Sequence, residues 1–123
     1  YFSKFETITI EPTILPNDVV AKGRPCYLKA EMNEILVRVK DGALEYLEDG
    51  EAEVIIYVFD KSVEVFSKMK HYALPLLNIL DLQLEDGTLI LHLRGNGGHK
   101  CYEGELIPIL YCLIKKLQAK ILS

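Results

Sequence analysis

The sequence predicts an α+β domain, with a mainly antiparallel sheet of about five to seven strands in hairpins and two helices packed on one face. Three observations lead to this fold class. Aspartate-glycine pairs separate runs of alternating apolar and polar residues, which is typical of tight hairpins. Residues 61–80 carry apolar side chains three and four positions apart, which predicts an amphipathic helix. Residues 106–121 show the same spacing and predict a second helix.

The first half of the chain predicts strands. Residues 5–10 (FETITI) alternate and are rich in β-forming side chains, and the segment RPCYLKAEM predicts a short edge strand. The runs NEILVRVK, ALEYLED and EAEVIIYVFD follow, separated by Asp41-Gly42 and Asp49-Gly50. Because glycine accepts the positive φ of a tight turn, we expect a meander of three antiparallel strands here.

The pattern changes after residue 60. Asp60 is a plausible N-cap for the expected helix, and Pro75 should kink or split it. The apolar stripe consists of Val63, Phe66, Met69 (or Lys70), Ala73, Leu77 and Leu80.

A hairpin and a last helix are expected in the final third. The runs DLQL and TLILHL flank Glu85-Asp86-Gly87, which predicts a tight turn. Lysines near the end of the last helix suit the negative pole of its dipole. Its apolar stripe consists of Leu106, Leu110, Leu113, Leu117 and Ile121.

Length and composition indicate one globular domain over residues 1–123, and a start without methionine suggests excision from a longer chain. Half of the residues are hydrophobic and 26% are charged, which is unlike a disordered tail. The balance of 14 basic against 18 acidic residues, a net charge of −4, argues against a nucleic-acid binder. The longest apolar run, IPILYCLI, falls short of the ~20 residues that span a bilayer, so no membrane partner is expected.

The three cysteines are Cys26, Cys101 and Cys112. An odd number at wide spacing is not a disulfide framework, and no signal peptide is visible, so the expected location is a reducing cytoplasm. We expect Cys26 and Cys112 to be small buried hydrophobic residues.

The segment RGNGGHKCYEG at 94–104 is the main candidate for a site. With a strand before it and a helix after it, its glycines would let an anion approach free backbone N–H groups at a helix start. It completes neither of the common glycine-rich phosphate motifs, so a plain mobile connection is the competing interpretation. The candidate ligand-binding residues are Arg94, Gly95, Asn96, Gly97, Gly98, His99 and Lys100.

Cys101 and His99 also raise the hypothesis of a thiol-dependent enzyme. A catalytic thiolate benefits from a helix N-terminus and a neighbouring cation such as Lys100. A zinc site would need three or four ligands, and His92, His99 and Cys101 lack a supporting spacing, so no metal is assigned. No cofactor is indicated by any motif.

Two further segments have ordinary interpretations. EYLEDGEAE holds five carboxylates without a calcium-loop pattern, so a solvated hairpin tip is expected. HYALPLLNIL (71–80) is apolar nearly all round, so it is either buried between layers or in contact with another chain.

The leading hypothesis is a non-catalytic binding or regulatory domain that works by protein association, as a homodimer or with a larger partner. Its basis is the apolar surplus around residues 73–80 and 106–114 and the lack of an acid–base constellation. The alternatives are a domain that binds a small phosphate-bearing or other anion through loop 94–101, and the Cys101/His99 enzyme.

Overall fold

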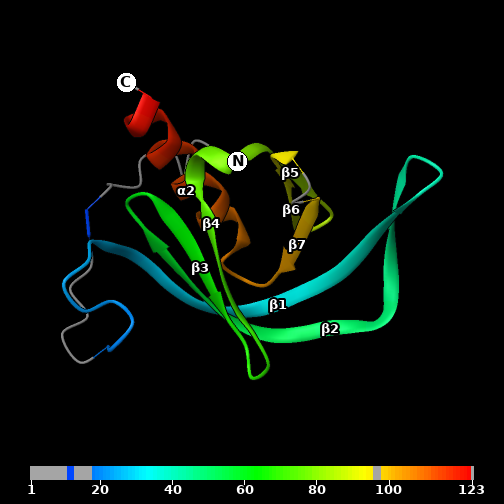
Figure 1. Ribbon diagram of the computed structural model, residues 1–123, viewed down its shortest axis with the longest axis horizontal. Helices are drawn as coiled ribbons and strands as arrows, with labels where there is room; N and C mark the ends of the chain where they lie inside the picture. The colour runs from blue at the N-terminus through cyan, green and yellow to red at the C-terminus, as the bar shows by residue number, and fades with distance from the viewer. Residues whose placement is uncertain (1–10, 13–17, 96–97, 123) are drawn as a thin grey trace.

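A computed structural model describes residues 11–12, 18–95 and 98–122, and for residues 48–50 the backbone alone (Figure 1). All strand pairings are antiparallel. The elements, in chain order, are β1 (Cys26–Lys40), β2 (Ala43–Phe59), β3 (Ser62–Phe66), β4 (His71–Pro75), the short 3₁₀ helix η1 (Leu76–Asn78), β5 (Ile79–Glu85), β6 (Thr88–Leu93), β7 (His99–Glu103) and the α-helix α2 (Ile107–Leu122).

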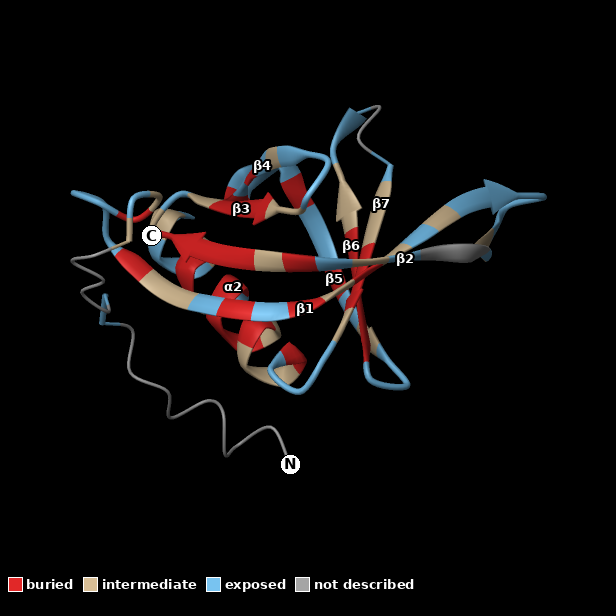
Figure 2. Ribbon diagram, turned by 90° about the horizontal axis from the view of Figure 1, so that it is seen from below, coloured by how far each residue is buried: buried red, intermediate tan, exposed pale blue. Residues whose placement is uncertain are grey.

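The seven strands of the described residues form one sheet in the order β4-β3-β2-β1-β7-β6-β5. Strands that follow each other in sequence pair, except β4 and β5, which lie at the two edges of the sheet. At the centre, β1 pairs with β7 and joins the group β1–β4 to the group β5–β7. The sheet is strongly curled, so that β5–β7 cross β1 and β2 steeply and α2 lies in the hollow between them (Figures 1 and 2). We call the side that faces α2 the inner face and the other side the outer face.

The core fills the inner face, because alternate residues of a strand point to the same side. Gln118 of α2 ties the helix to the link between β4 and β5, since its side-chain nitrogen donates to the carbonyls of Leu76 and Ile79, both at 2.8 Å. The buried core residues are Ala30, Met32, Val54, Ile56, Val58, Val63, Val65, Leu74, Leu76, Ile79, Leu82, Leu89, Leu91, Tyr102, Ile107, Leu110, Leu113, Ile114 and Leu117.

Two of the three predicted aspartate-glycine turns are confirmed. Asp41 and Gly42 have φ angles of 52° and 81°, and Asp86 and Gly87 have angles of 51° and 80°. Positive φ at both central residues is the requirement of the tight turn that matches strand twist. These turns connect β1 to β2 and β5 to β6.

The prediction of a turn at Asp49-Gly50 is wrong, because both residues lie within β2. The expected three-stranded meander is therefore one long hairpin of β1 and β2, and RPCYLKAEM is the start of the central strand β1 and not a separate edge strand. The extra length is absorbed as an irregularity: Ile35 pairs with Glu51 and Val37 with Tyr46, so residues 47–50 face a single β1 residue. The expected hairpin tip at EYLEDGEAE is likewise part of this strand.

The predicted helix over residues 61–80 is also wrong, because the segment forms β3, β4, η1 and the start of β5. Val63 and Val65 alternate on the inner face, and β-branched side chains favour strands. Ser67 makes the turn without glycine, since its Oγ accepts the backbone N–H of Lys70 at 3.1 Å. Pro75 ends β4 at its edge position instead of kinking a helix.

The last helix is confirmed, and it is the only α-helix in residues 18–95 and 98–122, so the expectation of two helices is not met. Leu110, Ile114 and Leu117 are buried, and burying a side chain of this size stabilises the fold by roughly 1.5–3 kcal/mol. Gly104 lets the chain enter α2 close to β1, because a Cβ there would lie 3.0 Å from the Cβ of Met32. The expected strand at 5–10 lies outside the described residues.

Candidate functional site

The glycine-rich segment is a connection between two strands. β6 ends at Leu93 and β7 begins at His99, so the helix start on which the anion hypothesis depended is separated from the loop by a whole strand. The Leu93 N–H donates to the Gly98 carbonyl at 2.9 Å, and Gly95 and Gly98 have φ angles of 66° and 71°. Asn96 and Gly97 lie outside the described residues. The anion hypothesis stays a prediction, without the helix dipole to support it.

Cys101 and His99 lie on β7 and share the outer face, because residues two apart in a strand point the same way. Cys101 is fully buried, and burial raises the pKa of its thiol to about 11, which disfavours the thiolate at neutral pH. His99 contacts His92 edge to face at 4.4 Å between ring centroids. Burial and then the charge of His92 lower the pKa of His99. This environment gives the enzyme hypothesis no support.

The two histidines lack hydrogen bonds at one nitrogen each: His92 Nε2 and His99 Nδ1 are buried without a partner among the described atoms. They are adjacent across β6 and β7. No third histidine, cysteine or carboxylate of the described chain joins them in a metal-binding group. Cys26 and Cys112 are buried, as the sequence predicted.

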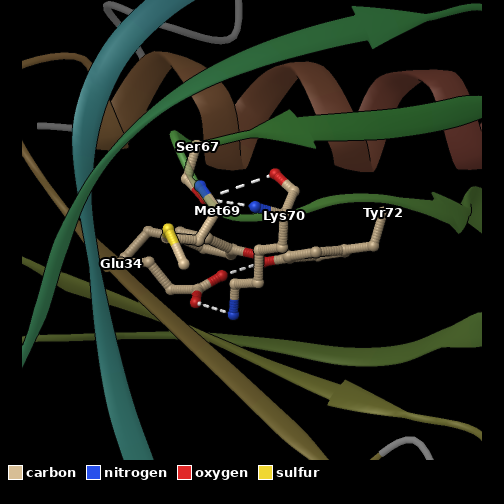
Figure 3. Close-up of polar contacts among 6 residues, drawn as sticks. Glu34, Ser67, Met69, Lys70 and Tyr72 are labelled. Atoms are coloured by element: carbon tan, nitrogen blue, oxygen red, sulfur yellow. Dashed lines mark hydrogen bonds and ion pairs between the residues drawn. The ribbon is translucent and has the colours of Figure 1, made fainter.

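A buried carboxylate, not foreseen from the sequence, lies on the inner face. Glu34 is 1% exposed, and its Oε2 accepts a hydrogen bond from Lys70 Nζ at 2.8 Å (Figure 3). Its other oxygen accepts the hydroxyl of Tyr72, which in turn shares a hydrogen bond with the hydroxyl of Tyr102. Burial raises the pKa of both tyrosines. Because every polar atom here has a partner inside the fold, the group closes the interior and does not present a site.

Lys100, a candidate anion ligand, belongs to this inner side. Its Nζ lies 4.7 Å from the centroid of the Tyr72 ring, and Lys70 Nζ lies 5.3 Å from the same ring. Arg94 is exposed beside η1, where its guanidinium approaches the Leu77 carbonyl at 3.5 Å. The two predicted cationic ligands therefore lie apart: Lys100 contacts the Tyr72 ring on the inner side, and Arg94 lies on the surface beside η1.

The outer face has two halves, and residues 18–24 cover the first, over β1, β2 and β3. Ala21 packs there in a cluster with Cys26, Tyr57 and Phe59. Asp18 anchors the segment, accepting hydrogen bonds from Lys29 Nζ at 2.7 Å and the Tyr57 hydroxyl at 2.8 Å. These two bonds, with Lys29 contributing most, hold the pKa of Asp18 down at about 2.

The second half of the outer face, over β1, β7, β6 and β5, holds an open groove of about 600 Å³. Two features distinguish it from the core: an apolar floor that includes Ile35 and Ile90, and a rim with three carboxylates. None of the nine described residues that line it is basic. They are Ile35, Leu44, Tyr46, Gln83, Glu85, Asp86, Thr88, Ile90 and Glu103.

The pKa of Tyr46 is raised, in part by the negative charge of this groove. Burial comes first among the causes that raise its pKa, and the negative charges of Glu85, Asp86 and Glu103 raise it further. None of the three rim carboxylates forms an ion pair with a described residue, although Glu34, Glu45 and Glu64 do. The groove is therefore an apolar trough with unneutralised negative charge.

One wall of the groove belongs to a projecting hairpin, residues 36–47, which we call the arm (Figure 1). The pairs Val37–Tyr46 and Val39–Leu44 place four apolar side chains on the groove side. Val39 is 58% exposed and Tyr46 is 50% exposed, and none of the four belongs to the core clusters of the described chain. Figure 2 shows how the buried centre of β1 and β2 gives way to this largely exposed end.

No protein-family model and no curated protein sequence matches this chain. In the part of the chain that the structure describes, no helix is both long and apolar enough to cross a bilayer. The function is therefore argued from the surface itself.

The groove could not be located from sequence patterns, because its residues come from five strands and a turn between positions 35 and 103. One local signal existed: Val37 and Val39 alternate with polar residues and continue the outer-face row of Ile35. Leu44 and Tyr46 alternate in the same way across the hairpin. That pattern showed an apolar face, and only the sheet shows that it stays uncovered.

Proposed function

We propose that this domain is a non-catalytic binding module that works by association with another protein, through the groove-side face of the arm. The observation that carries the proposal is the apolar row of Val37, Val39, Leu44 and Tyr46, which lies along the arm beyond Ile35 of the groove floor. Large apolar surface that a fold leaves uncovered next to a concavity is typical of a protein-binding surface.

The proposal no longer depends on the two segments that first indicated association. Most apolar residues of 73–80 and 106–114 enter the core, including Leu74, Leu76, Ile79 and Leu110. Leu77 of η1 and Leu80 of β5 remain 45% and 59% exposed, but neither lines the groove. The support for association has therefore moved from these segments to the arm.

Photo-cross-linking from the arm tests this function. A benzoylphenylalanine at position 39 should capture a specific protein in cells that express the domain, and the same group at position 36, on the opposite face of the arm, should capture it at least about fivefold less. With the cross-linker at position 39, Val37→Thr keeps shape and strand propensity and should weaken capture, whereas Leu36→Thr should not.

The same material distinguishes the partner. Sedimentation of the purified protein at high concentration reports whether the captured chain is a second copy. The proposal is overturned if position 39 captures nothing beyond what position 36 captures and the purified protein remains monomeric.

A further inference from the structure

The covered half of the outer face shows how this sheet holds a chain segment that carries an arginine. The guanidinium carbon of Arg24 lies 3.6 Å from the centroid of the Phe59 ring, and its Nη2 lies 2.5 Å from Glu64 Oε2. Phe59 is 1% exposed and Glu64 is 9% exposed beneath the segment. A ring and a carboxylate beneath the segment thus bind one cationic side chain, while Ala21 of the same segment packs on apolar neighbours.

The groove presents the same groups without a cation. Tyr46 supplies an aromatic ring on one wall, and Glu103 and Glu85 supply carboxylates on the other strands that line the groove. Ile35 and Ile90 supply the apolar floor. An arginine satisfies all three kinds of group at once, because its planar guanidinium stacks on a ring and also donates paired hydrogen bonds to a carboxylate.

We infer that the groove binds an arginine of an extended segment of a partner protein, with the guanidinium between the Tyr46 ring and the carboxylates of Glu103 and Glu85. The apolar neighbours of that arginine would rest on Ile35 and against Leu44. This inference rests on the proposed function, since it states which chemistry the associated protein brings to the wall of the arm.

The dimensions and charge of the groove favour a peptide segment over other occupants. A volume of about 600 Å³ exceeds one side chain and leaves room for its neighbours. A nucleic acid or another anionic ligand would be repelled by the rim carboxylates. A segment with lysine in place of arginine would keep the charge but lose the planar stacking and the paired hydrogen bonds.

The test uses a capped heptapeptide with one central arginine between valines and threonines, titrated into isotopically labelled protein and followed by NMR. Amide shifts should concentrate at Leu44, Tyr46, Ile90 and Glu103. Citrulline in place of the arginine keeps the shape but removes the charge, and it should weaken binding about tenfold, the scale of one lost charge-assisted hydrogen bond. The double variant Glu85→Gln/Glu103→Gln should lose affinity to the same degree.

The control for charge is Asp81→Asn, which removes one carboxylate from the exposed outer face of β5 outside the groove and should leave peptide affinity unchanged. Tyr46→Leu offers a second variant that keeps the apolar wall but removes the ring, and it should weaken the arginine peptide and leave the citrulline peptide unaffected. Equal affinity for the arginine and citrulline peptides, or no shifts at millimolar peptide, would overturn the inference.

These outcomes are separable from failure of the proposed function. If cross-linking from position 39 succeeds while the arginine peptide does not bind, the domain is an association module of different specificity. If shifts in the groove grow with protein concentration without peptide, the occupant is a second copy, which contradicts the inference and keeps the association. If the peptide binds but position 39 captures no protein, the result supports arginine binding by the groove and contradicts the proposed association through the arm.

Discussion

The two halves of the outer face contain similar side chains, but one half is covered by a chain segment and the other is an open groove. Over β1, β2 and β3, residues 18–24 lie across aromatic rings and a carboxylate, so that Tyr57, Phe59 and Glu64 are almost inaccessible to water. Over β5, β6 and β7 an equivalent combination of a ring, carboxylates and aliphatic side chains lies open as the groove. One sheet face therefore contains both a filled and an unfilled version of the same kind of surface.

This difference teaches what each half contributes. Apolar area removed from water stabilises the fold by roughly 25 cal/mol per Å², so the filled half stabilises the domain in every molecule. The groove leaves aliphatic surface and like charges together, an arrangement that does not help folding; under the proposed function, its gain would come on binding. Natural proteins keep such locally unfavourable surfaces where function needs them.

The largest expected effect breaks the filled half. Phe59→Ala removes a 1% exposed ring beneath Arg24 and should lower the free energy of unfolding by about 3–5 kcal/mol. Tyr46→Ala, the matching change in the open half, should cost less than about 1 kcal/mol because that ring is already half exposed. Urea unfolding followed by circular dichroism measures both. Equal losses would show that the groove is as much a part of the stable fold as the covered half.

A smaller effect is expected from the arginine itself. Arg24→Met keeps an aliphatic stem near Phe59 but leaves the Glu64 carboxylate with His71 alone, at 3.2 Å, and should cost about 1–3 kcal/mol. Lys22→Met in the same segment, at an exposed position, is the matched control and should be nearly neutral. Adding Glu64→Gln to Arg24→Met should recover part of the loss, because it removes the unpaired charge. No recovery would mean that packing, and not pairing, holds the segment.

The smallest expected change is a pH dependence of the filled half. Because the pKa of Asp18 is about 2 in the fold against an ordinary 3.8, the unfolded chain binds the proton more readily. Stability from this group is therefore present above pH 3.8 and lost as the pH falls through about 2. Thermal unfolding at a series of acidic pH values should show a shallower decline for Asp18→Asn than for the unmodified protein. Parallel declines would place the acid sensitivity at other carboxylates.

Local turn chemistry made part of the fold predictable. Asp41-Gly42 and Asp86-Gly87 adopt the positive φ angles that few other residue pairs tolerate, so two hairpins follow from four residues. The stripe of α2 likewise identifies its buried side through Leu110, Leu113 and Leu117. The same rule failed at Asp49-Gly50, because β1 is long enough to keep pairing with β2 beyond that point.

The segment from 61 to 80 shows why periodicity can mislead. Its apolar residues fit helical spacing, but Val63 and Val65 also alternate, and the neighbouring edge of β2 offers the pairing that decides between the two. That edge is formed by residues 55–58, and no window confined to 61–80 contains them. Tertiary pairing thus overrode a local preference.

The candidate surfaces were the least predictable part. The interest of loop 94–101, which lies between β6 and β7, came from its glycines, whereas Glu34, Tyr46 and Glu103 carried no motif. Glu34 alternates with Ala30 and Met32 on β1, a sign that it points inward. The partners of Glu34, Lys70 and Tyr72, lie far from it in the chain. In the groove, Glu103 is likewise distant in sequence from Tyr46.

By itself, the sequence determined the features that depend on neighbouring residues: two tight turns, the last helix and its apolar side, and the burial of Cys26 and Cys112. The tertiary structure alone decided that β1 lies between β2 and β7, which half of the outer face is covered, and where a groove remains. The physical reason is that turn and helix preferences arise from local backbone sterics. Strand order and exposed surface depend on which distant segments pair and pack in the whole chain.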